Sequence, residues 1–407
     1  MKFLVILIGI FQFWVVQAAD KDVKTVYLWN NVTYTEPEPA GNFVLGNNIP
    51  ISMAYYPTDD KLFLTLPRLF LGVPHTLAEI EVKKHREQSP KLSPFSGRPT
   101  KPLIMVYQPI IDECNRLWVL DEGEADSTDY NYTKQPPSFV AFDLKQAGYP
   151  EIIRHELSKD LLENGKNFFS EFAIDVVNPN HDGCSETFVY VGDYVKNCLY
   201  VYDYKQNTSW KFKHDSFKPE GKTTISYGSL YKESYQAGLF GLTLGDRDAK
   251  GNRPLFYITA SSTKLWKVDT KILKKKNSVF EPIYIGDRGK NTEAIVLAYD
   301  PKTKVLFFGE SNSRRFSCWN TGTQLSEETV DTVYKNETIF FGTDIEIDSQ
   351  GTLWLMSNAL PPVIGGPLVV SDTPLIRLMK VDPKAAIKST KCEKRRYSTG
   401  LRVKNRK

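Results

Sequence analysis

Thr343, Asn358 and Leu360 are the residues whose types and spacing best suit the binding of a small polar ligand. They lie near the two ends of the segment GTDIEIDSQGTLWLMSNALP, which alternates around Gln350-Gly351 as a β-hairpin does. With those two residues as the turn, Thr343 lies opposite Asn358 and points to the same side of the sheet. Leu360 follows on that side. A hydroxyl, an amide and an apolar side chain are therefore predicted to converge at one end of the hairpin.

Other polar residues are expected at the same end of the fold, because they close the second strands of similar segments. They are Arg68, Asp121, Glu122, Asp193, Ser261, Glu310 and Asn312. Carboxylates around an apolar cavity would attract an organic cation. The alternative is that these groups hydrogen-bond one another and close loops. The sequence leaves both interpretations open.

The elements that must position these residues repeat six times, at intervals of roughly 50 to 70 residues. In each unit a hydrophobic strand is followed by a polar turn, an aromatic-rich strand and a third strand. The second strands read KLFLTLPR, RLWVLDEG, TFVYVGDY, PLFYITAS, VLFFGESN and TLWLMSNA. This pattern predicts an all-β fold, a six-bladed β-propeller with four-stranded blades around a central channel.

Because one unit cannot bury both of its faces, the units must stack into a single domain, assigned to residues 19–390. The units are placed at about 48–83, 104–145, 170–205, 237–271, 293–322 and 342–383. Residues 19–47 are interpreted as an arm that leads into the first unit, and a helix is expected within 149–165.

The two ends of the chain differ from the repeats. Residues 1–18 have an early Lys, an apolar core and a small-residue cleavage site, which predicts a secretory signal peptide and an extracellular protein. A membrane anchor is less favoured because the apolar run is short. The basic tail 391–407 is expected to be solvated, or to make a weak contact with polyanions.

Secretion would expose four N-glycosylation sequons, at Asn31, Asn131, Asn207 and Asn336. It would also allow disulfides among the five cysteines. Cys114 and Cys184 fall in equivalent turns of adjacent units, so a disulfide between them is predicted. A Cys318–Cys392 disulfide would fix the tail, and Cys198 is predicted to be a free, buried thiol.

Several catalytic motifs fail. Gly221-Lys222-Thr223 lacks the glycine that a phosphate-binding loop needs at position 216, and no GxSxG segment occurs. The five histidines show no metal-ligand spacing. We therefore expect no metal, no cofactor and no catalytic residues, and no nucleic-acid partner for a chain without such a module. These expectations favour a binding protein over an enzyme.

Four runs together resemble the yellow / major royal jelly protein family, and most of all the yellow-related salivary proteins of blood-feeding sand flies. They read NNIPISMAYYPTDDKLFLTLPR, CNRLWVLDEG, GLFGLTLG and GTLWLMSNALP. The resemblance implies a six-bladed propeller. It also implies binding of serotonin, catecholamines and in some cases histamine, which would remove vasoconstrictor and inflammatory amines at a bite.

The resemblance further implies an amine site at the channel mouth, formed by Thr343, Asn358 and the residue two positions after the Asn. That residue is aromatic in the salivary relatives and is Leu360 here. The loss of a cation–π partner would cost about 0.5–2 kcal/mol of binding free energy. Phe341 or Phe240 could compensate.

Three functions follow from these observations. The first is a monomeric, secreted protein that sequesters biogenic amines without a membrane partner. The second is an enzyme, either of the dopachrome-converting type, with Glu310 or Asp193 as general base, or a metal-dependent lactonase-like propeller. The third is a structural or nutrient secreted protein.

Overall fold

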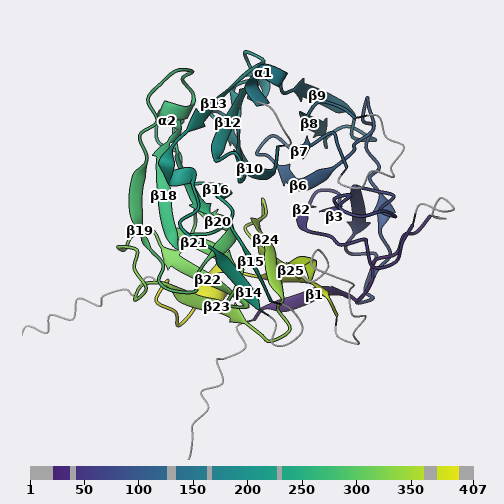
Figure 1. The fold of residues 1–407 in the computed structure, drawn as a ribbon. Coiled ribbons are helices and arrows are strands. Elements are labelled where there is room, and N and C mark those ends of the chain that lie inside the picture. Colours follow the sequence, from purple (N-terminus) through teal and green to yellow (C-terminus); the bar gives the residue numbers. More distant parts are fainter. Residues whose placement is uncertain are drawn as a thin grey trace, which may run out of the picture.

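The computed structural model describes residues 22–36, 43–125, 134–162, 167–226, 232–361 and 374–393. Its strands form six four-stranded antiparallel sheets that are arranged in a ring (Figure 1). The six-bladed β-propeller predicted from the repeat is therefore confirmed.

The first five blades are each built from four consecutive strands. Blades 1 and 2 contain β2 (Ser52–Tyr56), β3 (Lys61–Thr65), β4 (Leu77–Glu81), β5 (Ser93–Pro94), β6 (Val106–Ile111), β7 (Arg116–Asp121), β8 (Ser138–Asp143) and β9 (Glu151–Glu156). Blades 3 and 4 contain β10 (Phe169–Val176), β11 (Thr187–Asp193), β12 (Cys198–Asp203), β13 (Thr208–Lys213), β16 (Leu239–Leu244), β17 (Pro254–Thr259), β18 (Lys264–Asp269) and β19 (Ile283–Asp287). Blade 5 contains β20 (Ala294–Asp300), β21 (Val305–Glu310), β22 (Arg315–Asn320) and β23 (Asp331–Lys335).

Blade 6 joins the two ends of the folded chain. Its strands are β24 (Phe341–Ile347), β25 (Leu353–Asn358), β26 (Ile376–Val381) and β1 (Lys24–Trp29). β1 pairs antiparallel with β26, so the first strand of the chain is the outer strand of the last blade. The ring is closed by this pairing. The interpretation of residues 19–47 as a simple entry arm is corrected accordingly.

Helices are few in the described part of the chain. They include α1 (Lys159–Leu162), α2 (Thr270–Leu273) and α4 (Pro383–Ile387), with 3-10 turns at Asp182–Cys184 and Asp215–Phe217. The helix expected within 149–165 is correct only for α1, because residues 151–156 form strand β9. None of the helices in these ranges is long and apolar enough to cross a bilayer.

The apolar core lies mainly between neighbouring blades. Trp118 and Phe139 of blade 2, for example, share a cluster with Tyr200 and Tyr202 of blade 3. Because a blade on either side covers each sheet, strands such as β7 and β12 are buried along their whole length. This burial on both faces explains why the sequences of these strands are continuously apolar and do not alternate between apolar and polar residues.

Both predicted disulfides are confirmed. Cys114–Cys184 connects the turns of blades 2 and 3, and Cys318–Cys392 fixes the segment after α4 to strand β22. They close loops of 70 and 74 residues, for which the chain-entropy estimate is about 4 kcal/mol of stability each. Cys198 is buried and forms no disulfide.

Several predictions fall on surface or terminal residues. The predicted signal peptide at 1–18, Asn131 and most of the basic tail lie outside the described residues. Asn207 and Asn336 are exposed, whereas Asn31 is half-buried. Glycosylation at the four sequons stays a prediction.

The innermost strands share one irregularity that shapes the centre of the ring. In blades 2 to 6 the pairing of the first strand with the second shifts register near the start of the first strand. The residues inside these bulges are Tyr107, Gln108, Ser170, Glu171, Phe240, Gly241, Ile295 and Thr343. β-Bulges redirect side chains, and here they do so at one mouth of the channel.

Candidate functional site

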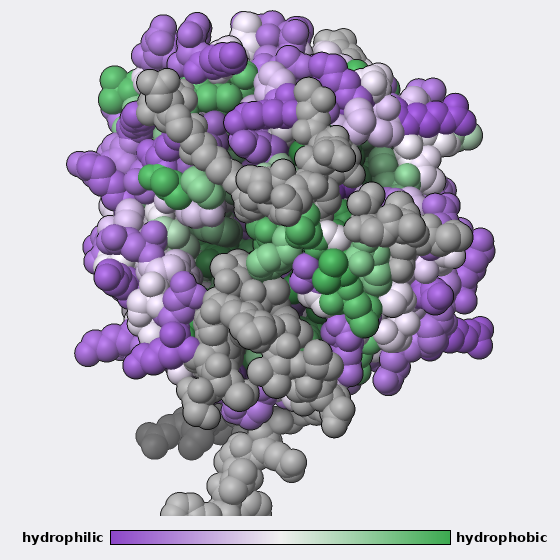
Figure 2. Space-filling model, turned by 45° about the vertical axis from the view of Figure 1, so that its right-hand side comes forward, coloured by the Kyte–Doolittle hydropathy of each residue, from purple (hydrophilic) through white to green (hydrophobic). Residues whose placement is uncertain are grey.

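A cavity of about 480 Å³ lies at the end of the ring where the inner strands begin. We call it the central cavity. All six blades contribute to its lining, which is mostly apolar and aromatic, with Ile51, Leu69, Phe70, Tyr107, Phe168, Phe169, Tyr194, Ile225, Tyr235, Phe240, Ile295, Phe341 and Leu360. Figure 2 shows apolar residues gathered around a hollow near the middle of the molecule, with hydrophilic residues around the periphery.

The bulges build this lining. Every bulge residue that has a side chain lines the central cavity. Gly241 is the exception, and a Cβ there would lie 2.5 Å from Leu297 Cδ2 and 2.9 Å from the Ile295 carbonyl oxygen. Glycine at this position therefore allows blades 4 and 5 to approach closely.

The structure brings Thr343, Asn358 and Leu360 together, in two different roles. Thr343 and Leu360 line the central cavity, whereas Asn358 is fully buried and is not among the lining residues. Asn358 Nδ2 donates to the Pro50 carbonyl at 2.7 Å and to Thr343 Oγ1 at 3.4 Å. Its Oδ1 accepts from the Leu360 N–H at 2.9 Å. Asn358 thus positions both lining residues.

The predicted register of this hairpin is wrong. Asn358 pairs with Phe341, and Thr343 is the bulge residue. The loop has three residues instead of two, because Asp348 and Thr352 pair and Gly351 takes a φ of 86°. Asn358 and Thr343 meet because the Asn358 side chain reaches the bulge, not because they face each other in the ladder.

The carboxylates predicted to form a ring at the channel rim hold loops in place instead. None of the seven polar residues predicted to close the second strands, from Arg68 to Asn312, is among the described residues that line the cavity. Asp121 accepts from the N–H groups of Ile104 and Met105, at 3.0 and 2.9 Å. Glu310 accepts from Arg315 Nε at 2.6 Å, and Asp193 from the Lys196 N–H at 2.7 Å. These three acids therefore hold loops in place, as the alternative predicted, but they do so by bonding to backbone N–H groups and Arg315 and not to one another.

Two other carboxylates, which the sequence analysis missed, do line the cavity: Glu171 and Glu233. Glu171 lies in the bulge of β10, and its Oε2 accepts from the Leu242 N–H of the next blade at 3.2 Å. Burial, followed by the nearby charge of Asp344, raises the pKa of Glu171 well above its usual value. A single acid inside the aromatic run FFSEFAI was the signal that could have revealed it.

The bulges also explain how the blades are connected at the centre. A bulge leaves a backbone N–H without a partner in the ladder. Gln108 Oε1 of blade 2 accepts from the Phe172 N–H of blade 3 at 2.8 Å, just as Glu171 accepts from Leu242. A polar side chain in the bulge of one blade thus accepts from the backbone N–H that follows the bulge of the next blade.

Blade 6 is connected to blade 1 by two acids of β24. Asp344 Oδ2 accepts from Ser52 Oγ at 2.7 Å and from the Met53 N–H at 2.8 Å. Glu346 Oε2 accepts from the Tyr55 N–H at 3.2 Å. Burial raises the pKa of Asp344 to about 6, and burial together with Asp344 raises the pKa of Glu346 well above its usual range.

A hairpin outside the blades completes the cavity wall. It consists of β14 (Thr223–Ser226) and β15 (Lys232–Tyr235), and it lies over the ring without joining a blade (Figure 1). Ile225, Glu233 and Tyr235 line the cavity. At its base, Thr223 Oγ1 donates to the Ala260 carbonyl at 3.1 Å and the Tyr235 hydroxyl donates to Ser311 Oγ at 3.3 Å.

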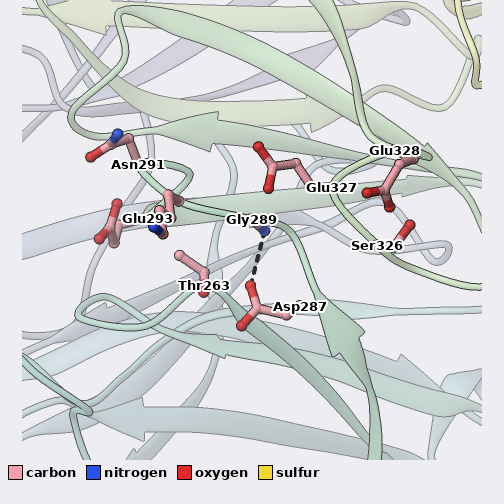
Figure 3. Close-up of a pocket in the computed structure, with 9 residues that line it drawn as sticks. Thr263, Asp287, Gly289, Asn291, Glu293, Ser326, Glu327 and Glu328 are labelled. Carbon is pink, nitrogen blue, oxygen red and sulfur yellow. Dashed lines mark hydrogen bonds between the residues drawn. The ribbon is translucent and has the colours of Figure 1, made fainter.

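A second hollow, of about 580 Å³, lies at the side of blades 4 and 5. Its polar lining includes the acids Asp287, Glu293, Glu327 and Glu328 (Figure 3). Asp287 Oδ1 accepts from the Gly289 N–H at 2.9 Å. No group of three or more His, Cys, Asp or Glu in the described ranges could hold a metal ion. The central cavity is the better candidate, because it alone combines aromatic walls with the predicted residues.

The comparison with protein families decides the identity. Residues 104–392 match the model of the family described as major royal jelly protein. This chain belongs to the major royal jelly protein family. The yellow / major royal jelly resemblance inferred from the sequence is therefore confirmed.

Two relatives within this family show how close the similarity is. The chain is 50% identical over 375 residues to the yellow-related salivary protein SP04 of Phlebotomus argentipes, covering 91% of this chain and 94% of the relative. It is 45% identical over 381 residues to the yellow-related salivary protein LJM111 of Lutzomyia longipalpis, covering 92% and 95%.

Solved structures give a weaker likeness. A streptogramin B lyase structure matches 86% of this chain and 95% of its own, with 10% identity and a TM-score of 0.42. A luciferin-regenerating enzyme matches 84% and 92%, with 9% identity and a TM-score of 0.43. Neither likeness carries information about function.

Proposed function

We propose that this major royal jelly family protein is secreted in saliva and sequesters biogenic amines in the central cavity. The names of its relatives place those proteins in saliva. Two disulfides fit an oxidising, extracellular compartment. Sequestration requires a preformed site and no turnover.

The observation that carries the proposal is the chemistry of the cavity lining. Phe168, Tyr194 and Phe240 form a continuous aromatic wall, with ring centroids 5.7 Å and 5.2 Å apart. Glu171 and Glu233 supply negative charge, and none of the described lining residues is Lys, Arg or His. An aromatic ring joined to an ammonium group, as in serotonin or a catecholamine, complements both features. The volume lies within the range of small-ligand sites.

The enzymatic alternatives gain less support from the geometry. Glu310 and Asp193, the acids expected to act as a general base, hold loop backbone and Arg315. Neither lines the central cavity. A general base must reach the proton that it removes, so these two acids are poorly placed for a substrate in that cavity.

The test is calorimetric titration of the secreted protein with serotonin, noradrenaline and histamine. We expect one amine per chain, with a dissociation constant in the micromolar range or tighter for serotonin or noradrenaline. Phe240→Ala should weaken binding about tenfold by removing one wall of the site. Tyr284→Ala, an exposed aromatic on β19, is the matched control and should leave binding unchanged. Titrations without heat for all three amines, confirmed by equilibrium dialysis, would overturn the proposal.

A further inference from the structure

We propose that Glu171 is the counter-ion of the bound ammonium group and that Ser170 donates or accepts a hydrogen bond beside it. The ligand would then lie with its charged end at the bulge of β10 and its ring against the aromatic wall. The site would select arylalkylammonium ions over neutral analogues with the same ring. This inference rests on the proposed amine-binding function and specifies what the cavity recognises.

The bulge of β10 places Ser170 and Glu171 at the cavity together. The two residues lie opposite a single residue of β11, Gly192. A Cβ at Gly192 would lie 2.4 Å from Ser170 Oγ, so glycine provides the room that this side chain needs. Both residues are more than nine-tenths buried, and both line the cavity.

Ser170 provides an observation that is independent of the charge. Its Oγ is buried and has no hydrogen-bond partner among the described residues. Buried hydroxyl groups are nearly always hydrogen-bonded in folded proteins. An ammonium group next to Glu171 that comes within hydrogen-bond distance of Ser170 Oγ would supply the missing partner.

Glu171 is better placed than Glu233 to act as the counter-ion of the ammonium group. The N–H group of Leu242 in the next blade holds its carboxylate in place. Glu233 is exposed on the β15 hairpin, where water and salt screen its charge. A buried charge pair is screened less, so the same ammonium group gains more from Glu171.

Among the described residues that line the cavity or affect the charge of Glu171, the other ionisable groups are acids or phenols. Asp344 of β24 lies close enough to affect its charge, and Glu233, Tyr107, Tyr194 and Tyr235 share the cavity lining. Burial and Asp344 favour the protonated form of Glu171 in the empty site, and an incoming cation favours the carboxylate. Amine binding should therefore release a proton, and amine affinity should rise with pH until the amine itself loses its charge.

The test compares Glu171→Gln with the wild type in titrations with serotonin and with 5-hydroxytryptophol, its neutral analogue. We expect the variant to bind serotonin at least tenfold more weakly and to bind the alcohol as the wild type does. Glu346→Gln is the matched control: it is a half-buried acid of β24 whose carboxylate is bonded to a backbone N–H, and it does not line the cavity. Its serotonin affinity should stay within threefold of wild type.

Proton release provides the second readout. Titrations in two buffers of different ionisation enthalpy should show net proton release on serotonin binding by the wild type and less or none by Glu171→Gln. Serotonin affinity within threefold of wild type in a folded Glu171→Gln variant would overturn the inference while leaving amine binding intact.

Two further outcomes complete the test. If Glu171→Gln does not fold, the test is the relative affinity of the wild-type protein for serotonin and for 5-hydroxytryptophol. We expect the wild type to prefer serotonin, and equal affinity for the two ligands would overturn the inference. If the wild type binds no amine at all, the proposed function and this inference both fail.

Discussion

Leu360 is the lining residue whose replacement offers the clearest gain of function. It lies where the sand fly salivary relatives are expected to present an aromatic ring, and its backbone N–H is fixed by Asn358. Leu360→Phe should tighten serotonin binding about tenfold, because a ring at this position adds aromatic contact with the ligand in a water-poor site. Calorimetric titration measures the change.

The control for that substitution is Leu71→Phe. Leu71 is exposed and does not line the cavity, so the same change there should leave serotonin affinity as it is. Weaker binding by Leu360→Phe would show that the ring fills space the ligand needs, and would contradict this prediction.

At the scale of elements, one turn recurs between the first and second strands of three blades. Asp112, Asp248 and Asp348 each accept from the backbone N–H groups two and four residues further on. A residue with positive φ follows three positions after each Asp, namely Asn115, Gly251 and Gly351. This turn has three loop residues, and it sets the register of the hairpin that follows.

In blades 2 and 6 the same Asp also accepts from a buried tryptophan. Trp354 Nε1 donates to Asp348 Oδ2 at 2.8 Å. Asp348→Ala should lower the free energy of unfolding by about 2–4 kcal/mol, because a buried indole N–H loses its partner together with two turn bonds. Urea unfolding followed by tryptophan fluorescence measures it. Asp248→Ala, which removes the same turn bonds without a tryptophan, should have a clearly smaller effect, and equal losses would contradict this account.

The limits of sequence-based prediction follow from these elements. The second and third strands of each unit could be recognised because two-sided burial gives them long apolar runs. The turn Asp-x-x-Gly was visible at Asp348, and recognising it would have corrected the hairpin register. The bulges could not be foreseen, because they arise where inner strands from different blades meet at the axis. Glu171 was missed for that reason.

At the scale of the whole molecule, the buried acids at the axis should make stability depend on pH. The pKa of Asp344 is raised to about 6 by burial, above its value in an unfolded chain. The folded state therefore binds the proton of Asp344 more tightly than the unfolded chain does. The contribution of Asp344 to the free energy of unfolding falls as pH rises from about 4 to about 6. A shift of about two pKa units corresponds to a change of about 3 kcal/mol in the free energy of unfolding.

Asp344→Asn should remove that part of the pH dependence, because an amide does not titrate. Urea midpoints between pH 4 and pH 7 should change less for the variant than for the wild type. Asp215→Asn, an exposed acid that pairs with Lys218, is the control and should leave the slope in this window unchanged. A wild-type slope that persists in Asp344→Asn would assign the titration to the neighbouring acids Glu171 and Glu346.

The pairing of β1 with β26 has a consequence for biosynthesis. Strand β1 is the first of the described strands to leave the ribosome, and its partner β26 is the last of them. Throughout translation the nascent chain is an open arc with an unpaired strand at its start, and such edges invite association with other chains. A chain that stops before β26 would leave β1 without its partner strand, so we expect such a chain to aggregate instead of closing the ring.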